Sequence, residues 1–167
     1  MYVPFEELSA ESRVWIYQGS RTFTFNEVEL VSKALKDFCV QWNAHGQALK
    51  SSFRIENNQF VIMSVDEDFH NPSGCSIDSS VGVLRNIHLA TGVDLLDRSK
   101  VSFYLDDEVT LIPLSEVKAN FKSGRLLAST ITFNTLASTK AEWEEKWQIP
   151  TEKSWMVKYL SETALIS

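Results

Sequence analysis

The run Phe60–Val65 constrains the fold most strongly, because it is almost entirely apolar and shows no polar alternation. A strand of this kind is typically covered on both faces, as in the centre of a sheet. The run Arg13–Gln18 has the same character and predicts a second central strand. By contrast, Ser52–Glu56 and Val101–Leu105 alternate polar and apolar residues, which is typical of edge strands.

Two helical patterns lie between these strands. A capping box from Thr24 to Glu27 opens the first pattern, and apolar residues then recur at spacings of three and four. The second pattern covers about residues 77–91 and is predicted to be capped by Ser76 or Asp78. The resulting order of strand, helix, strand, strand, helix, strand predicts an α+β fold with a ferredoxin-like split βαββαβ sheet.

The pattern changes beyond the fourth predicted strand. We expect a short helix over 115–122, a strand over 129–136, and a helix that a second capping box opens at Thr139. The sequence therefore predicts a ferredoxin-like α+β domain over residues 1–100. A smaller αβ module with a C-terminal helix and a tail is expected over residues 101–167.

Charge and composition exclude several classes of partner. The net charge is −6 and the isoelectric point about 5.1, whereas nucleic-acid binding needs clustered Lys and Arg. No apolar run approaches the roughly 20 residues that a membrane-spanning helix requires. The first residues lack the features of a signal peptide. We therefore expect a cytoplasmic protein that binds neither nucleic acid nor membranes, and leave its oligomeric state open.

Residues 101–147 contain a strand pair, a short helix, a Gly-Arg-Leu step and a strand that begins with Thr. The residues that carry this pattern are Phe103-Tyr104-Leu105-Asp106, Leu114-Ser115-Glu116-Val117-Lys118-Ala119, Phe121, Ser123-Gly124-Arg125-Leu126, Thr130 and Phe133. The segment resembles the small GYF-2-type module, although Ile112-Pro113 stands where that family has Gly-Pro. Such modules are usually interaction or packing units, so the resemblance implies a protein partner for this part of the chain.

The whole chain also resembles a group of short bacterial proteins, some of which are labelled ABC transporter ATPase. Three segments carry the likeness, namely Tyr2–Glu7, Trp42–Gly46 and Gly74–Ser80. A phosphate-binding P-loop needs Gly followed by Lys and then Ser or Thr. None of the six glycines of this chain is followed by Lys, so we do not expect ATPase activity.

The predicted topology brings the loops 43–50 and 66–76 to one end of the sheet, with the start of the second helix beside them. Candidate site residues gather there: His45, Lys50, Asp66, Glu67, His70, Cys75, Ser76, Asp78 and Ser79. A thiol at a helix N-terminus with a nearby base is the arrangement of a cysteine nucleophile. The competing interpretation is that Cys75 is a small buried residue before a capped helix, which is the commoner case.

Metal and anion binding at the same place are less favoured. His45, His70 and Asp66 have no short ligand spacing, and the two cysteines of the chain form no ligand pair, so we predict no metal and no cofactor. The Ser76 hydroxyl could help to hold an anion, but the charge of Asp78 opposes this and helix capping is the better interpretation.

Two functions follow from these patterns. The leading one is a non-enzymatic interaction or ligand-binding protein that acts through its second module. The alternative is a small thiol-dependent enzyme that uses Cys75 with His45 or Asp66. Cys75 within hydrogen-bond reach of His45 would favour the enzyme, whereas an apolar tryptophan-bearing surface with a buried Cys75 would favour the binding protein.

Overall fold

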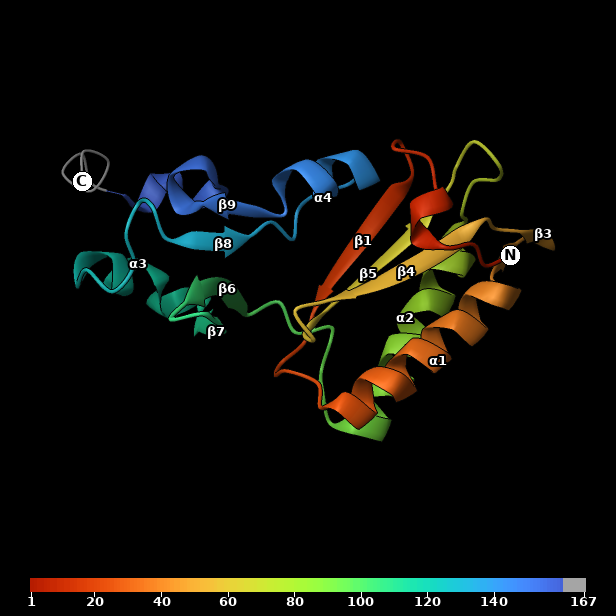
Figure 1. Cartoon of the computed structure of the whole chain (residues 1–167), viewed down its shortest axis with the longest axis horizontal. Coiled ribbons are helices and arrows are strands. Elements are labelled where there is room, and N and C mark those ends of the chain that lie inside the picture. Colours follow the sequence, from red (N-terminus) through yellow and green to blue (C-terminus); the bar gives the residue numbers. More distant parts are fainter. Residues whose placement is uncertain (161–167) are drawn as a thin grey trace. The chain divides into compact units, whose positions relative to one another are not determined.

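The structure is a computed structural model that describes residues 1–160 and shows an α+β protein (Figure 1). The chain forms two compact units, of which the first comprises Met1–Asp97 and Thr135–Glu145. The second unit comprises Arg98–Asn134 and the described residues from Lys146 onward. The last part of the predicted tail, residues 161–167, lies outside the described residues.

A three-stranded antiparallel sheet organises the first unit. Its order is β1 (Arg13–Gln18), β5 (Phe60–Val65) and β4 (Ser51–Glu56). Every residue of β5 is buried, which confirms its predicted central place. The edge position of β4 is also confirmed. The prediction that β1 is central is wrong, because the strand expected beside it belongs to the second unit.

Two helices cover one face of this sheet. The first, α1 (Phe25–Gln41), begins with the predicted capping box between Thr24 and Glu27. The second, α2 (Gly74–Thr91), begins three residues earlier than predicted. Its cap is Ser73 rather than Ser76 or Asp78, because Ser73 and Ser76 exchange side-chain-to-backbone hydrogen bonds in a reciprocal capping box.

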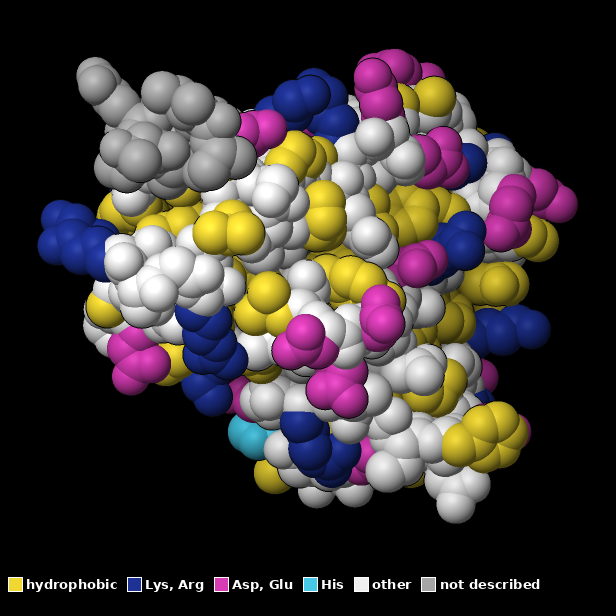
Figure 2. Space-filling view, turned by 60° about the vertical axis from the view of Figure 1, so that its left-hand side comes forward, with side chains coloured by type: hydrophobic (Ala, Val, Ile, Leu, Met, Phe, Trp, Pro, Cys, Tyr) yellow, Lys and Arg dark blue, Asp and Glu magenta, His cyan; other side chains and the backbone are white. Residues whose placement is uncertain are grey.

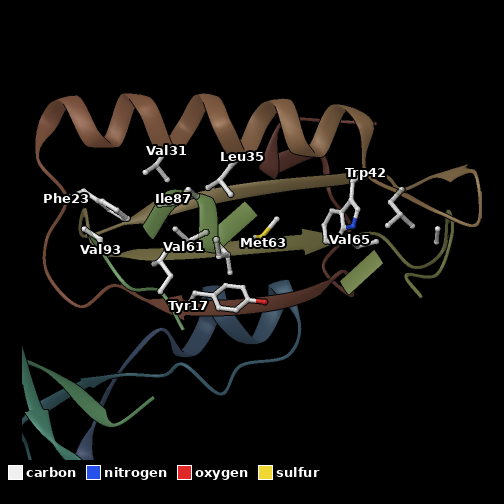
Figure 3. Close-up of a cluster of buried hydrophobic side chains, with 14 residues drawn as sticks. Tyr17, Phe23, Val31, Leu35, Trp42, Val61, Met63, Val65, Ile87 and Val93 are labelled. Carbon is white, nitrogen blue, oxygen red and sulfur yellow. The ribbon is translucent and has the colours of Figure 1, made fainter. Parts of the chain in front are cut away.

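The main core lies between these helices and the sheet. Figure 3 shows Val31 and Leu35 of α1 on the same side as Ile87 of α2, against the odd-numbered residues of β5. Those residues are Val61, Met63 and Val65. The other face of β5 is buried as well, and there η1 (Phe5–Glu7) packs on β4.

Short segments cover part of each edge of the sheet. Tyr2 forms a parallel bridge with Ser51 at the start of β4. On the other side, Thr139 forms an antiparallel bridge with Arg13 of β1. A ferredoxin-like sheet would carry its fourth strand beside β1, and here a single bridge occupies the beginning of that position.

A four-stranded antiparallel sheet organises the second unit. Its order is β7 (Glu108–Pro113), β6 (Lys100–Leu105), β8 (Ile131–Phe133) and β9 (Gln148–Pro150). The helix α3 (Leu114–Lys122) follows β7, as predicted. A small core joins these elements to η2 (Thr151–Lys153) and η3 (Trp155–Tyr159), and its buried members are Phe103, Ile112, Val117, Leu126 and Met156.

The strand β6 does not complete the first sheet. Asp106 and Asp107 have positive φ angles of 50° and 61° and form the two-residue turn that folds β7 directly onto β6. This local hairpin decides the partner of the strand, whereas the alternating sequence of β6 only indicates that one face is exposed.

The predicted boundary at residue 100 needs one correction. The strands β8 and β9 pair with each other, yet the chain between them runs out to the first unit. The connecting segment contains α4 (Lys140–Lys146). Ala137, which precedes the helix, is buried, as are Lys140 and Trp143 within it. Burial of these side chains explains why residues 135–145 belong to the first unit rather than to the predicted module 101–167.

Candidate functional site

The structure brings together the two segments that were expected to meet at one end of the first sheet. The indole Nε1 of Trp42 donates a buried hydrogen bond of 2.8 Å to the carbonyl oxygen of Ser76. Trp42 precedes the small hairpin of β2 (Asn43–Ala44) and β3 (Gln47–Ala48), and Ser76 lies in the first turn of α2. The hairpin and the start of α2 are therefore neighbours.

The Cys75 thiol is exposed, in contrast with the interpretation of a buried residue before a capped helix. Cys75 is the second residue of α2, and its carbonyl oxygen accepts a hydrogen bond of 3.0 Å from the hydroxyl of Ser79. The thiol of Cys39 is fully buried, and burial raises its pKa to about 11. Cys75 is consequently the accessible thiol of the described chain.

His45 is not hydrogen-bonded to this thiol within the described residues. It lies at the tip of the β2–β3 hairpin with φ of 51°, followed by Gly46 with φ of 78°. Its side chain is exposed, and within residues 1–160 it makes no hydrogen bond with Cys75. The positive φ angles show that this Asn-Ala-His-Gly segment serves the geometry of a tight turn.

The carboxylates near the site shape the loop after β5. Asp66 is buried, its Oδ1 accepts the Asp68 N–H at 3.0 Å, and its Oδ2 lies 3.8 Å from Lys50 Nζ. Glu67 forms an ion pair with Arg13 at 3.6 Å. The Asp66 carboxylate therefore stabilises the loop through the Asp68 N–H and lies close to the Lys50 ammonium group.

The hydroxyl of Ser76 is fully used by the helix cap. Its Oγ accepts the Ser73 N–H at 2.6 Å and donates to the Ser73 carbonyl at 2.7 Å. Asp78 and Ser79 are exposed on the first turns of α2, and His70 stacks edge-on against Phe69 with ring centroids 4.9 Å apart. Among the predicted residues, Asp66, Ser76 and Ser79 use their side chains in backbone hydrogen bonds, and Lys50 and Glu67 form ion pairs.

Residues 1–160 contain neither a cluster of metal-ligating side chains nor a membrane-spanning helix. Over residues 1–160, no group of three or more His, Cys, Asp or Glu side chains is placed to hold a metal ion. Among the same residues, none of the helices combines the length and apolarity needed to cross a membrane.

A second candidate surface lies on η3 of the second unit. The indole of Trp155 is 39% exposed, and Val157 is also exposed. The Nζ atom of Lys158 lies 5.5 Å from the Trp155 ring centroid and 5.3 Å from that of Tyr159. We call Trp155, Val157, Lys158 and Tyr159 the η3 surface. From the sequence alone, only Trp155 could indicate a binding surface here. The cation–π contacts of Lys158 depend on the 3-10 turn, which the sequence did not predict.

Comparison with known protein families, with curated proteins and with solved structures finds no match to this chain. The resemblances to the GYF-2-type module and to the short bacterial proteins therefore stay predictions.

Proposed function

We propose that this chain is a non-enzymatic interaction protein that binds a protein partner through the η3 surface of its second unit. The observation that carries the proposal is the exposed Trp155 indole, since large aromatic side chains at a protein surface are enriched in binding sites. The resemblance of residues 101–147 to an interaction module supports a protein partner for the second unit, and the η3 surface follows that segment in the sequence.

The η3 surface is fixed by contacts beneath and beside it. Met156 is completely buried in the core of the second unit. The Ser154 Oγ accepts the Met156 N–H at 3.1 Å and donates to the Thr151 carbonyl at 2.7 Å. A rigid platform of this kind lowers the entropy that is lost on binding. On the face of the molecule drawn in Figure 2, which labels no residues, hydrophobic side chains reach the surface between charged ones.

Site-specific photo-crosslinking tests this function. We would place a benzophenone amino acid at position 157 and irradiate the cells that produce the protein. We expect one discrete crosslinked partner from this position, and its loss when Trp155→Ala is added. The matched control places the same group at Leu89, which is 86% exposed on α2. Crosslinks that are identical from both positions, or that survive Trp155→Ala, would contradict the proposal.

The exposure of Cys75 keeps a thiol-dependent enzyme as the second candidate. A helix N-terminus can support a nucleophilic thiolate, and the described chain has one accessible thiol. An enzyme of this class should release p-nitrophenol from p-nitrophenyl acetate in a burst that Cys75→Ser abolishes. A rate that is unchanged by Cys75→Ser would exclude Cys75 as the nucleophile.

We further propose a ferredoxin-like relationship for the first unit and a cytoplasmic location for the protein. The order β1-β5-β4 with α1 and α2 on one face supports a ferredoxin-like relationship for the first unit, with the fourth strand lacking from that sheet. Both described cysteines are free thiols, which supports a reducing compartment such as the cytoplasm.

A further inference from the structure

The first unit holds a segment of chain that arrives from between β8 and β9. We call residues 135–145 the strap. We use the name docking surface for the part of the first unit that holds it, namely Phe5, Glu6, Leu8, Ala10, Ser12 and Val14. The strap and this surface are far apart in the sequence, and each belongs to the first unit.

Backbone hydrogen bonds make the first kind of attachment. Three N–H···O bonds join the strap to the segment that leads into β1, from Val14 to Ser138, from Lys140 to Ser12 and from Ala141 to Ala10, at 3.0, 2.8 and 2.9 Å. Thr139 also forms an antiparallel bridge with Arg13. Pairing of this kind resembles the addition of a peptide to the edge of a sheet.

A buried lysine makes the second attachment. Lys140 is only 6% exposed, although lysine is almost never buried without partners. Its Nζ donates to the carbonyl oxygens of Leu8 at 2.8 Å and Glu6 at 3.3 Å. These carbonyls lie at the end of η1, where helical turns favour a positive charge. The same Nζ lies 5.5 Å from the centre of the Phe5 ring.

An indole makes the third attachment, three residues further along the strap. Trp143 is 5% exposed and meets Phe5 edge-on, with ring centroids 5.5 Å apart. The Arg54 guanidinium lies over the same indole at 5.5 Å. Residues three apart on a helix share a face, so Lys140 and Trp143 approach the docking surface together.

Apart from the buried side chain of Ala137, the rest of the strap contributes little to this attachment. Leu136 is 68% exposed, and the side chains of Glu144 and Glu145 also lie at the surface. The recognition elements are thus one lysine, one aromatic ring and an extended stretch before them. Such a small set of anchors is typical of peptide recognition, where few side chains carry most of the affinity.

We propose that the docking surface is a peptide-binding site of the first unit that the strap occupies in cis. Its ligand class is a segment with an extended Ser/Thr stretch, then a lysine, and an aromatic residue three positions after the lysine. This site is distinct from the η3 surface, so the inference does not depend on the proposed function. A tethered strap has an effective concentration on the order of millimolar, and therefore excludes free peptides until it is released.

The test uses the full chain and a fluorescent peptide that corresponds to residues 135–147. The double variant Lys140→Ala with Trp143→Ala removes the anchors of the strap and empties the site. We expect it to bind the peptide saturably, at least about ten-fold more tightly than the unsubstituted protein does. A peptide that carries the same two substitutions should not bind. The matched control is Glu145→Ala with Lys146→Ala, which changes exposed residues of the same helix and should leave peptide binding as weak as in the unsubstituted protein.

Two results would overturn the proposal. One is a folded double variant, judged by circular dichroism, that fails to bind the peptide at about 1 mM. The other is equal peptide affinity for the unsubstituted protein and the double variant, because the peptide would then bind elsewhere. If the double variant does not fold, Lys140→Met replaces it, since methionine keeps the apolar stem without the ammonium group. The same gain in peptide affinity over the unsubstituted protein is then required.

Discussion

At the scale of single residues, one ion pair ties the two helices of the first unit together. Arg21 forms two hydrogen bonds with Glu27 in α1, at 2.8 and 2.9 Å. It also donates to the Thr91 carbonyl at the end of α2, at 2.6 Å. The hydrogen bonds from Arg21 are the main cause that lowers the pKa of Glu27 from 4.5 to about 2, and the backbone N–H of Thr24 adds to it.

This lowered pKa predicts an acid-dependent loss of stability. A carboxylate with a lowered pKa in the folded state stabilises it above the unfolded value, and this contribution disappears as the pH falls from about 4.5 to about 2. Urea midpoints over this range should therefore fall more steeply for the unsubstituted protein than for Glu27→Gln. The control Glu29→Gln changes an exposed residue of the same helix and should follow the unsubstituted protein. Parallel pH profiles for Glu27→Gln and the unsubstituted protein would show that Glu27 is not the cause of the acid-dependent loss of stability.

At the scale of elements, the start of α2 depends on two serines. Ser73 Oγ accepts the Ser76 N–H at 3.2 Å, and Ser76 Oγ accepts the Ser73 N–H at 2.6 Å. Ser73→Ala should lower the free energy of unfolding by about 1 kcal/mol, as is usual for the loss of an N-cap. Chemical denaturation measures this change, and Ser79→Ala, on the exposed side of the same helix, is the control. An effect of Ser73→Ala no larger than that of Ser79→Ala would refute the capping role.

The elements also show which parts of the fold a sequence can reveal. The central place of β5 and the capping box of α1 were predictable, because continuous apolarity and cap spacing are local signals. The partner of β6 was not, since alternation indicates a half-exposed strand but does not say which sheet it joins. The nearness of Trp42 and Ser76 followed from topology, whereas the place of His45 at the tip of a tight turn depended on local turn geometry.

The burial of Lys140 was the least predictable feature of the candidate sites. Composition and spacing predict that a lysine faces the solvent. The Glu144 carboxylate lies 3.8 Å from the Lys140 Nζ, and the carbonyl oxygens of Glu6 and Leu8 accept its hydrogen bonds, which compensates for the burial. These acceptors lie more than 130 residues away in the chain. A sequence pattern that covers one helix carries no information about partners at that distance.

At the scale of the whole molecule, the two units have separate hydrophobic cores. Leu35 is buried in the core of the first unit, and Ile112 in that of the second. Replacing either residue by Ala should cost about 2–5 kcal/mol in its own unit, because a cavity forms in a packed interior. The strap is the critical segment, since its sequence position lies between β8 and β9 but its packing belongs to the first unit.

Hydrogen exchange measured by mass spectrometry tests whether the stability of the strap comes from the first unit or from the second. With Leu35→Ala, exchange should rise in α1, in β5 and also in the peptide that covers α4, because all three share the first unit. With Ile112→Ala, exchange should rise in β6 and β7, while the α4 peptide keeps its protection. The opposite response of α4, protected in Leu35→Ala and exposed in Ile112→Ala, would show that its stability comes from the second unit. The strap would then be a loop of the β8–β9 hairpin rather than a ligand of the docking surface.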